Sequence, residues 1–260
     1  MSCAGMIEGP LPFETTRDAL LGGRLMLTQP RTGHRAGHDA LLLAALAPAQ
    51  ARRIVDLGAG VGTAGLAVLA RLPEASAHLV ELDPATAALA RQNAAGNGMS
   101  DRCAIVEADV RTLGKPAGPA EPAAQAADLV IANPPFNARA AHQTSPHARR
   151  ATAHMADGDT LMDWVLAAYR CLKPGGQVGL ILRPADLATL LDALAGRFGA
   201  AELLPVHARA DAPAVRLLVR AVKGRRTPPA IRPGLILAEA DGRTTVTADA
   251  VLRGEAGLIP

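Results

Sequence analysis

The stretch Val55-Asp56-Leu57-Gly58-Ala59-Gly60-Val61-Gly62 decides the fold of this chain. Its first residues complete the apolar segment 53–57, which predicts a buried parallel strand. Three glycines at alternate positions follow, and glycine lets a backbone turn tightly and approach a ligand closely. A helix is expected from about residue 63 to residue 72. The stretch therefore predicts a strand, a glycine turn and a helix, with a ligand bound at the turn.

Strands and helices alternate along the rest of the chain. We expect further strands at residues 77–81, 103–107, 128–132, 177–182, 201–205 and 215–222. We expect helices at residues 84–97, 160–172 and 187–194, the second of which ends at Lys173-Pro174-Gly175-Gly176. The alternation predicts an α/β, Rossmann-like fold, with a mostly parallel sheet, right-handed crossovers and helices on both faces.

The N-terminal residues stand apart from this alternation. A glycine pair within residues 18–27 predicts a β-hairpin, and a helix is expected over residues 40–46. We therefore expect residues 1–50 to form an N-terminal hairpin and helix. Residues 51–260 form the core with a C-terminal tail, in one structural domain.

Two stretches break the alternation further along. Residues 112–127 are rich in Ala, Pro and Gly and predict a flexible insertion between the third and fourth strands. Residues 224–229 read as a linker, so we expect a short strand-and-helix tail beyond them.

Composition limits the class of protein. The 260 residues are nearly half hydrophobic, which suits a globular protein with a sizeable core. Three widely spaced cysteines match no zinc or redox spacing and predict reduced thiols in the cytoplasm. No signal peptide is expected, and no apolar run reaches the roughly 18 residues of a membrane span. A net charge of +3 is compatible with a polyanionic partner and with an ordinary basic enzyme.

Two residues of the turn region indicate what the turn binds. Thr63 stands where a dinucleotide fingerprint requires glycine or alanine. Asp56, just before the turn, suits a cationic ligand better than a pyrophosphate, because a carboxylate repels a diphosphate. S-adenosylmethionine carries a sulfonium and an ammonium. The turn therefore favours S-adenosylmethionine over a nicotinamide dinucleotide.

The ends of the next two strands supply groups for the rest of that cofactor. Glu81 is placed to accept hydrogen bonds from both ribose hydroxyls. Asp109 can accept from the adenine amino group, although Glu107 is a near neighbour of the same type. Leu82 and Val110 can cover the two faces of the adenine ring.

Asn133-Pro134-Pro135-Phe136 directly follows the fourth strand. The side-chain oxygen of Asn133 and the carbonyl of Pro134 can accept the two N–H bonds of an exocyclic amine. The nitrogen can then pyramidalise, with its lone pair toward a methyl donor, and Phe136 can stack on the base. Catalysis would rest on positioning and fixed dipoles. The motif predicts methyl transfer to an exocyclic amine.

With these motifs the chain resembles the class I S-adenosylmethionine-dependent methyltransferases that carry an Asn-Pro-Pro-aromatic motif. Within them it is most similar to the bacterial valine tRNA adenine-N6 methyltransferase group, over residues from about 15 to 254. The resemblance implies a seven-stranded sheet of order 3-2-1-4-5-7-6, with the last strand antiparallel. It also implies that the N-terminal segment covers the methionine end of the cofactor.

The resemblance assigns residues too. It implies that Gly58 and Gly60 contact the cofactor, Glu81 its ribose and Asp109 its adenine, with Asn133 and Phe136 on the target base. We expect Ala59 and Asn133 among the cofactor-binding residues as well. Phe136 stands where the tRNA enzymes often have tyrosine, and phenylalanine also occurs in guanine-N2 rRNA enzymes. The target base is therefore left open between adenine and guanine.

The segment after this motif favours nucleic acid. Residues 133–155 contain no acidic residue, whereas Arg139, Arg149 and Arg150 can hold phosphates. A solvated basic loop is the alternative. The histidines of this segment have no metal-ligand spacing, so no metal is predicted. A target base in a loop need only be splayed out, which suits single-stranded RNA.

Our main hypothesis is an RNA adenine-N6 methyltransferase in the cytoplasm, with tRNA as the favoured substrate. Glutamine-N5 methylation of a release factor is the first alternative, because that amide offers the same paired N–H groups. Those enzymes usually carry a helical domain before the cofactor motif, and here about fifty residues with a hairpin precede it. Guanine-N2 methylation of rRNA, a noncatalytic RNA-binding subunit and a nicotinamide dehydrogenase are the others. The oligomeric state stays open.

Overall fold

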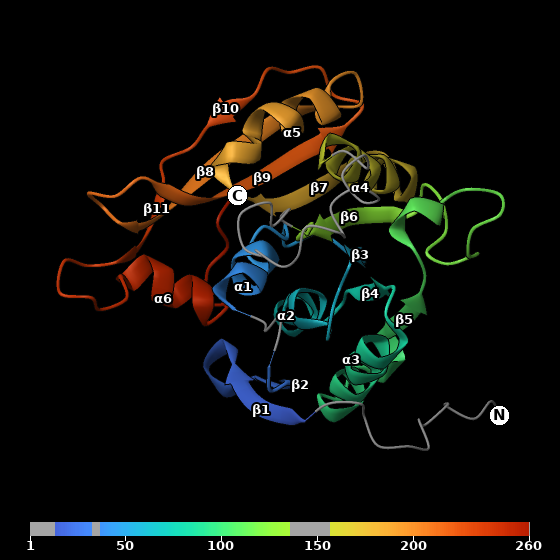
Figure 1. The fold of residues 1–260 in the computed structure, drawn as a ribbon, viewed down its shortest axis with the longest axis horizontal. Helices are drawn as coiled ribbons and strands as arrows, with labels where there is room; N and C mark the ends of the chain where they lie inside the picture. The colour runs from blue at the N-terminus through green and yellow to red at the C-terminus, as the bar shows by residue number, and fades with distance from the viewer. Residues whose placement is uncertain (1–13, 33–36, 136–156, 260) are drawn as a thin grey trace, which may run out of the picture.

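One central β-sheet dominates the computed structural model, which describes residues 14–32, 37–135 and 157–259 (Figure 1). Its strands are β3 (Arg53–Leu57), β4 (Ser76–Glu81), β5 (Cys103–Glu107), β6 (Ala127–Ala132), β7 (Leu172–Leu182), β8 (Phe198–Arg209), β9 (Ala214–Lys223), β10 (Ala230–Ile231) and β11 (Leu235–Ala238). They lie in the order β10-β8-β9-β7-β6-β3-β4-β5, and β11 also pairs with β8. The pairs from β5 to β7 are parallel, and β9 is antiparallel to both β7 and β8.

The expected strand order is confirmed. Numbering the strands from β3 to β9 gives 3-2-1-4-5-7-6, with the seventh strand antiparallel. The expected count of seven is too low for the described part of the chain, because β10 and β11 also pair, in parallel, with the outer edge of β8. The tail thus extends the sheet with two short strands, where one was expected.

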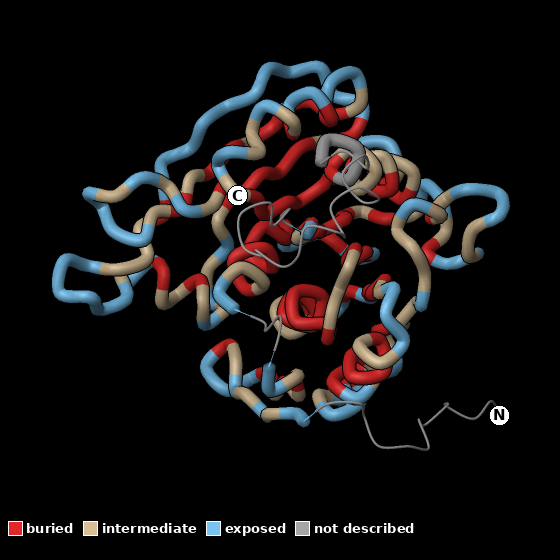
Figure 2. The backbone as a smooth tube through the Cα atoms, in the orientation of Figure 1, coloured by how far each residue is buried: buried red, intermediate tan, exposed pale blue. Residues whose placement is uncertain are grey.

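Helices cover both faces of the sheet. They are α1 (His38–Ala44), α2 (Thr63–Arg71), α3 (Pro84–Gly96), α4 (Asp157–Cys171), α5 (Leu187–Leu194) and α6 (Val246–Leu252). Neighbouring strand residues point to opposite faces, so Ile54 and Ile131 join one hydrophobic cluster while Val55 and Val130 join the other. The first cluster includes α1, α2, α3 and α6, and the second includes α4 and α5. Buried backbone concentrates along the sheet and the inner sides of these helices (Figure 2).

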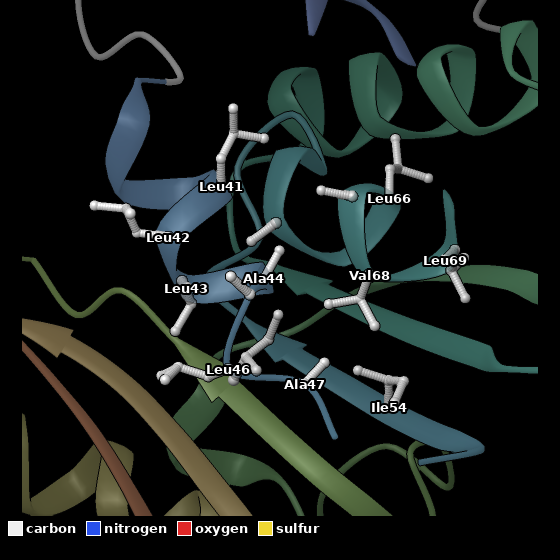
Figure 3. Packing of buried hydrophobic residues seen from close by; sticks show 14 of the residues in the cluster. Leu41, Leu42, Leu43, Ala44, Leu46, Ala47, Ile54, Leu66, Val68 and Leu69 are labelled. Carbon is white, nitrogen blue, oxygen red and sulfur yellow. The ribbon is translucent and has the colours of Figure 1, made fainter. Parts of the chain in front are cut away.

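The first cluster is built mainly from leucine and alanine. Figure 3 shows Leu41 and Ala44 of α1 on the side that faces Leu66 and Val68 of α2, while Leu46 follows α1 and Ile54 lies on β3. Leu46, Leu66 and Leu69 are fully buried. These side chains hold α2 against the sheet, and α2 begins directly after the glycine turn.

Several predicted boundaries move. β7 starts at Leu172 instead of residue 177, because Leu172 pairs with Ala127 and the intervening Lys173–Gly176 stretch is an irregularity in the register. β8 reaches from Phe198 to Arg209, well beyond the expected 201–205. The helix expected at 40–46 begins earlier, at His38, and ends at Ala44. Residues 113–126 hold neither a helix nor a strand, and their expected flexibility stays a prediction.

The N-terminal hairpin is confirmed. β1 (Thr15–Leu20) pairs antiparallel with β2 (Leu25–Pro30) around a short 3-10 turn over Leu21–Gly23. The hairpin lies apart from the large sheet and packs against α3 and α2 (Figure 1). The expected division of the chain at residue 50 stays a prediction.

Candidate active site

The carboxyl ends of four parallel strands meet at one edge of the sheet. In register, Leu57 pairs with Val80 and with Ala132, and Glu81 pairs with Glu107. The loops that follow β3, β4, β5 and β6 therefore lie side by side. This edge brings together the predicted cofactor residues of the first three strands and the Asn-Pro-Pro motif of the fourth.

The glycine loop after β3 requires two of its glycines for different reasons. Gly58 has φ +62°, and a Cβ added there would lie 2.3 Å from Cη2 of Trp164 on α4. Gly60 has φ +57°, and a Cβ added there would meet no atom of the structure within 4 Å. L-residues rarely adopt this left-handed conformation. Gly58 thus lies against an indole, whereas Gly60 borders open space.

Two hydrogen bonds from the loop to β4 hold it in place. The backbone N–H of Ala59 donates to the carbonyl of Val80 at 2.9 Å. The N–H of Gly60 donates to Oε2 of Glu81 at 2.8 Å, and Asp83 N–H donates to Oε1 at 2.9 Å. Each carboxylate oxygen has two lone pairs. Glu81 therefore keeps acceptor capacity for ribose hydroxyls while it is fixed at the loop.

Asp56 lies deeper than its predicted role requires. It is 2% exposed, and its Oδ2 accepts the backbone N–H of Gly65 at 2.8 Å. Gly62 begins α2 as a cap residue without a side chain, so Asp56 supplies the acceptor that a capping side chain would give. Burial raises the pKa of Asp56 to about 7, with a further rise from the charge of Glu81. Its contact with a cationic cofactor stays a prediction.

Asp109, Leu82 and Val110 line the neighbouring loops. Asp109 accepts the N–H of Arg111 at 2.9 Å and pairs with its guanidinium at 2.6 Å, and that hydrogen bond lowers the pKa of Asp109. Leu82 is 65% exposed and Val110 is half-buried. Glu107, the other candidate for the adenine, also pairs with an arginine, on α3, at 2.6 Å. The choice of Asp109 for the adenine stays a prediction.

Asn133 carries a feature that needs an explanation. Its Oδ1 is buried and has no hydrogen-bond partner among the residues that the structure describes. Pro134 after it is buried, and Pro135 is exposed. A buried acceptor without a donor costs about 1–3 kcal/mol. The role of this atom as the acceptor for a bound amine stays a prediction.

Four predicted residues lie outside the described part of the chain. They are Phe136 of the motif and the arginines Arg139, Arg149 and Arg150. Stacking by Phe136 and phosphate contacts by the arginines stay predictions.

Sequence reasoning missed two residues at this edge. Trp164 was expected only as part of the apolar face of its helix, yet its indole lies against Gly58. Asn93 on α3 donates from Nδ2 to the carbonyl of Val61 in the glycine loop at 2.9 Å. A single tryptophan in the chain was an available signal for the first residue. Asparagines four residues apart on α3 were the signal for the second.

Within residues 14–32, 37–135 and 157–259, no three His, Cys, Asp or Glu side chains gather as metal ligands. The same ranges hold no helix that is both long and apolar enough to cross a membrane.

Comparison with known proteins gives a family match. The profile of the family described as methyltransferase small domain matches residues 37–205. The tRNA1(Val) (adenine(37)-N6)-methyltransferase of Aeromonas hydrophila is 33% identical over 154 residues, 58% of this chain and 61% of that protein. The chain thus spans about three fifths of that relative. The Serratia proteamaculans protein of the same name is 30% identical over 213 residues, 80% of this chain and 78% of that protein.

Solved structures agree on the fold. A structure described as a predicted O-methyltransferase from Agrobacterium tumefaciens has a TM-score of 0.72 and 34% identity, covering 85% of this chain and 98% of its own. The 16S rRNA N2 G1207 methyltransferase of Thermus thermophilus, in complex with AdoMet and guanosine, has a TM-score of 0.55 and 22% identity. It covers 83% of this chain and 52% of its own. Both share the layered sheet described above.

Proposed function

This chain belongs to the methyltransferase small domain family, whose cofactor is S-adenosylmethionine, and we propose that it methylates N6 of an adenine in tRNA. Two relatives at 33% and 30% identity are named tRNA1(Val) (adenine(37)-N6)-methyltransferase, which supports this substrate. S-adenosylmethionine would supply the methyl group at the loop edge of the sheet. The residues of this chain hold the two reactants and orient the amine.

One observation carries the proposal: Oδ1 of Asn133 is buried and has no hydrogen-bond partner within residues 14–32, 37–135 and 157–259. An exocyclic amine has two N–H groups, and Asn133 Oδ1 accepts one while the carbonyl of Pro134 accepts the other. Proline has a fixed φ, so that carbonyl is held rigidly. With both N–H bonds engaged, the nitrogen lone pair is turned out of conjugation with the ring. The proton that is lost after transfer passes to water, so no side chain is needed as a base.

Residues on neighbouring loops fit the cofactor. Gly60 borders open space, which allows close approach of a ligand to the backbone. Glu81 accepts from the ribose, and Leu82 and Val110 pack on the adenine, with Leu82 exposed before binding. Asp109 has its carboxylate held by Arg111 beside the same space. These groups together would take the adenosine part of the cofactor.

Basic residues beyond the motif would hold the RNA. Arg139, Arg149 and Arg150 fall in a segment without acidic residues. Contacts to phosphates position a nucleic acid without reading its bases. The strength of binding should then fall as salt concentration rises.

A direct methylation assay separates the candidate acceptors. Purified protein with methyl-labelled S-adenosylmethionine is offered tRNA, small-subunit rRNA and a peptide release factor side by side. The proposal expects label in tRNA, recovered as N6-methyladenosine after digestion. Label that is confined to the release factor, or that is recovered as N2-methylguanosine, would refute it. The Asn133→Ala variant serves as the control, because it removes the acceptor while leaving the cofactor loop intact.

A further inference from the structure

Asn93 on α3 and Asn97, the residue that caps the C-terminus of α3, face the hairpin strand β2. Asn93 and Asn97 are one turn apart, so they lie on the same helix face about 6 Å from each other along the axis. Alternate residues of a strand repeat about every 6.8 Å. The spacing of the two asparagines therefore matches the spacing of Met26 and Thr28 on β2.

Each asparagine bonds the backbone of one strand residue in both directions. Asn97 Oδ1 accepts the N–H of Met26 at 2.9 Å, and its Nδ2 donates to the carbonyl of Met26 at 2.7 Å. Asn93 Oδ1 accepts the N–H of Thr28 at 2.7 Å, and its Nδ2 donates to the carbonyl of Thr28 at 2.8 Å. A side-chain amide offers the same donor and acceptor as a peptide group. The two side chains thus act as a neighbouring strand along the edge of β2.

Asn93 and Asn97 differ in the second hydrogen of the amide. Asn93 uses it to donate to the carbonyl of Val61 at 2.9 Å, whereas Asn97 donates within its own helix, to the carbonyl of Asn93 at 2.7 Å. Asn93 is 2% exposed, so water does not compete for these bonds. The buried side chain of Asn93 therefore links the hairpin to the glycine loop, whereas Asn97 bonds the hairpin but not the glycine loop.

The Val61 carbonyl depends on this donor because of Asp56. The N–H of Gly65, four residues after Val61, would be its partner if α2 began earlier, but that N–H donates to Asp56 at 2.8 Å. Val61 is itself buried. The loop is then fixed from β4 through Ala59 and Glu81, and from α3 through Asn93.

We propose that Asn93 is a positioning residue, which couples docking of the N-terminal hairpin to the cofactor-binding conformation of the glycine loop. The inference rests on the proposed function only in taking this loop as the S-adenosylmethionine site. Coupling of two binding events is reciprocal. A docked hairpin therefore favours cofactor binding, and a bound cofactor protects the hairpin to the same extent.

Asn93→Ala and Asn97→Ala form a matched pair for the test. Both variants lose the paired bonds to β2, so both should lower the midpoint of thermal unfolding, and Asn93→Ala should lower it more because Asn93 is buried and makes one further bond. Only Asn93→Ala also frees the Val61 carbonyl. We expect calorimetry with S-adenosylhomocysteine to give an affinity about tenfold weaker for Asn93→Ala and within about threefold of wild type for Asn97→Ala. Equal losses in the two variants, or no loss in Asn93→Ala, would overturn the proposal.

A second measurement uses the unaltered chain, in case a variant does not fold. Hydrogen exchange of the Met26 and Thr28 amides should slow when S-adenosylhomocysteine is added, since these amides report opening of the hairpin from α3. Unchanged exchange at a saturating ligand concentration would overturn the coupling.

Failure of the wild-type chain to bind S-adenosylhomocysteine would refute the proposed cofactor instead. The link between Asn93 and the glycine loop would then be tested by hydrogen exchange of the Gly60 amide, measured without ligand. Faster exchange of this amide in Asn93→Ala than in Asn97→Ala would support the link, and equal exchange in the two variants would contradict it.

Discussion

Replacing Gly58 by alanine tests the contact between the glycine loop and α4. The new Cβ would lie 2.3 Å from Cη2 of Trp164 and 3.0 Å from its Cζ3, which is too close for any real contact. Trp164 packs on the hydrophobic cluster beneath α4, so it cannot withdraw freely. Either the indole or the loop must move.

The expected cost has two parts. A residue with a side chain at φ +62° loses about 1–2 kcal/mol relative to glycine. Overpacking against the partly buried indole of Trp164 costs about 1–3 kcal/mol more. Gly58→Ala should therefore lower the free energy of unfolding by about 2–5 kcal/mol. Gly60→Ala has a similar φ of +57° but no atom near its Cβ, so it should cost only about 1–2 kcal/mol.

Urea unfolding followed by far-ultraviolet circular dichroism gives these free energies without relying on tryptophan fluorescence. A double-mutant cycle with Trp164→Leu isolates the steric part, since a smaller side chain makes room for the Cβ. The coupling energy between Gly58→Ala and Trp164→Leu should be about 1–3 kcal/mol in the relieving direction. For cofactor affinity we expect the opposite ranking of the two variants. Relative to the stability that each variant loses, Gly60→Ala should weaken cofactor binding more than Gly58→Ala does.

Two results would refute this reasoning. Equal stability losses for Gly58→Ala and Gly60→Ala would mean that the indole does not lie against the loop. A coupling energy near zero with Trp164→Leu would mean the same, even if Gly58→Ala is destabilising.

Three further predictions concern separate parts of the molecule. Asp56 has a pKa of about 7 in the folded protein and near 3.8 in the unfolded chain, so it binds its proton more tightly when the protein is folded. Its contribution to stability is therefore fully present below pH 4 and is lost as pH rises through 7. The unfolding free energy of wild type should thus fall relative to Asp56→Asn by up to about 4 kcal/mol between pH 4 and 8, and parallel pH curves would contradict this. The Lys223 ammonium donates to the carbonyls of Tyr169 and Leu172, each at 2.6 Å, at the C-terminal end of α4. Lys223→Met removes these bonds and should lower the free energy of unfolding in urea by about 2 kcal/mol. An unchanged midpoint would show that Lys223 does not stabilise this helix end. Leu82→Ser should leave stability within about 0.5 kcal/mol, yet weaken S-adenosylhomocysteine several-fold by calorimetry, and unchanged affinity would remove Leu82 from the adenine site.

Local sequence patterns predicted the parts of the fold whose cause is local. β3 and β5 begin and end where expected. β3 is buried on both faces, and such a strand reads as an apolar run between turns. β5 lies at the edge of the sheet and is only partly buried, but its sequence is also a short apolar run. α3 begins at Pro84 as expected, since proline suits a first helical turn and Asp83 caps it. The order of strands came from the family resemblance and not from these patterns.

The errors arise where pairing or contact is not local. β10 consists of two exposed residues, so no burial pattern marks it, and only the edge of β8 makes it a strand. The start of β7 at Leu172 depends in the same way on the partner Ala127 across the sheet. A glycine or proline run predicts a turn, but it does not show that the backbone pairs on both sides.

In the candidate site, too, local features could be expected from the sequence, whereas contacts between distant segments could not. The sequence identified the residue types at the strand ends, including Glu81 and Asn133, because strand ends of a parallel sheet share one edge. The hydrogen bond between Asp56 and Gly65 joins residues nine positions apart and depends on where α2 begins. The approach of Trp164 to Gly58 depends on how α4 packs on the sheet, and the two residues are far apart in the sequence, so spacing alone does not reveal it.

The central claim is that Asn133 orients an adenine amine of tRNA for methylation, and nucleoside mass spectrometry tests it directly. Total tRNA is compared from cells with the gene, cells without it and cells complemented by either wild type or Asn133→Ala. We expect an N6-methyladenosine signal that disappears with the gene and returns with wild type but not with Asn133→Ala. A signal that persists without the gene, or that Asn133→Ala restores fully, would contradict it.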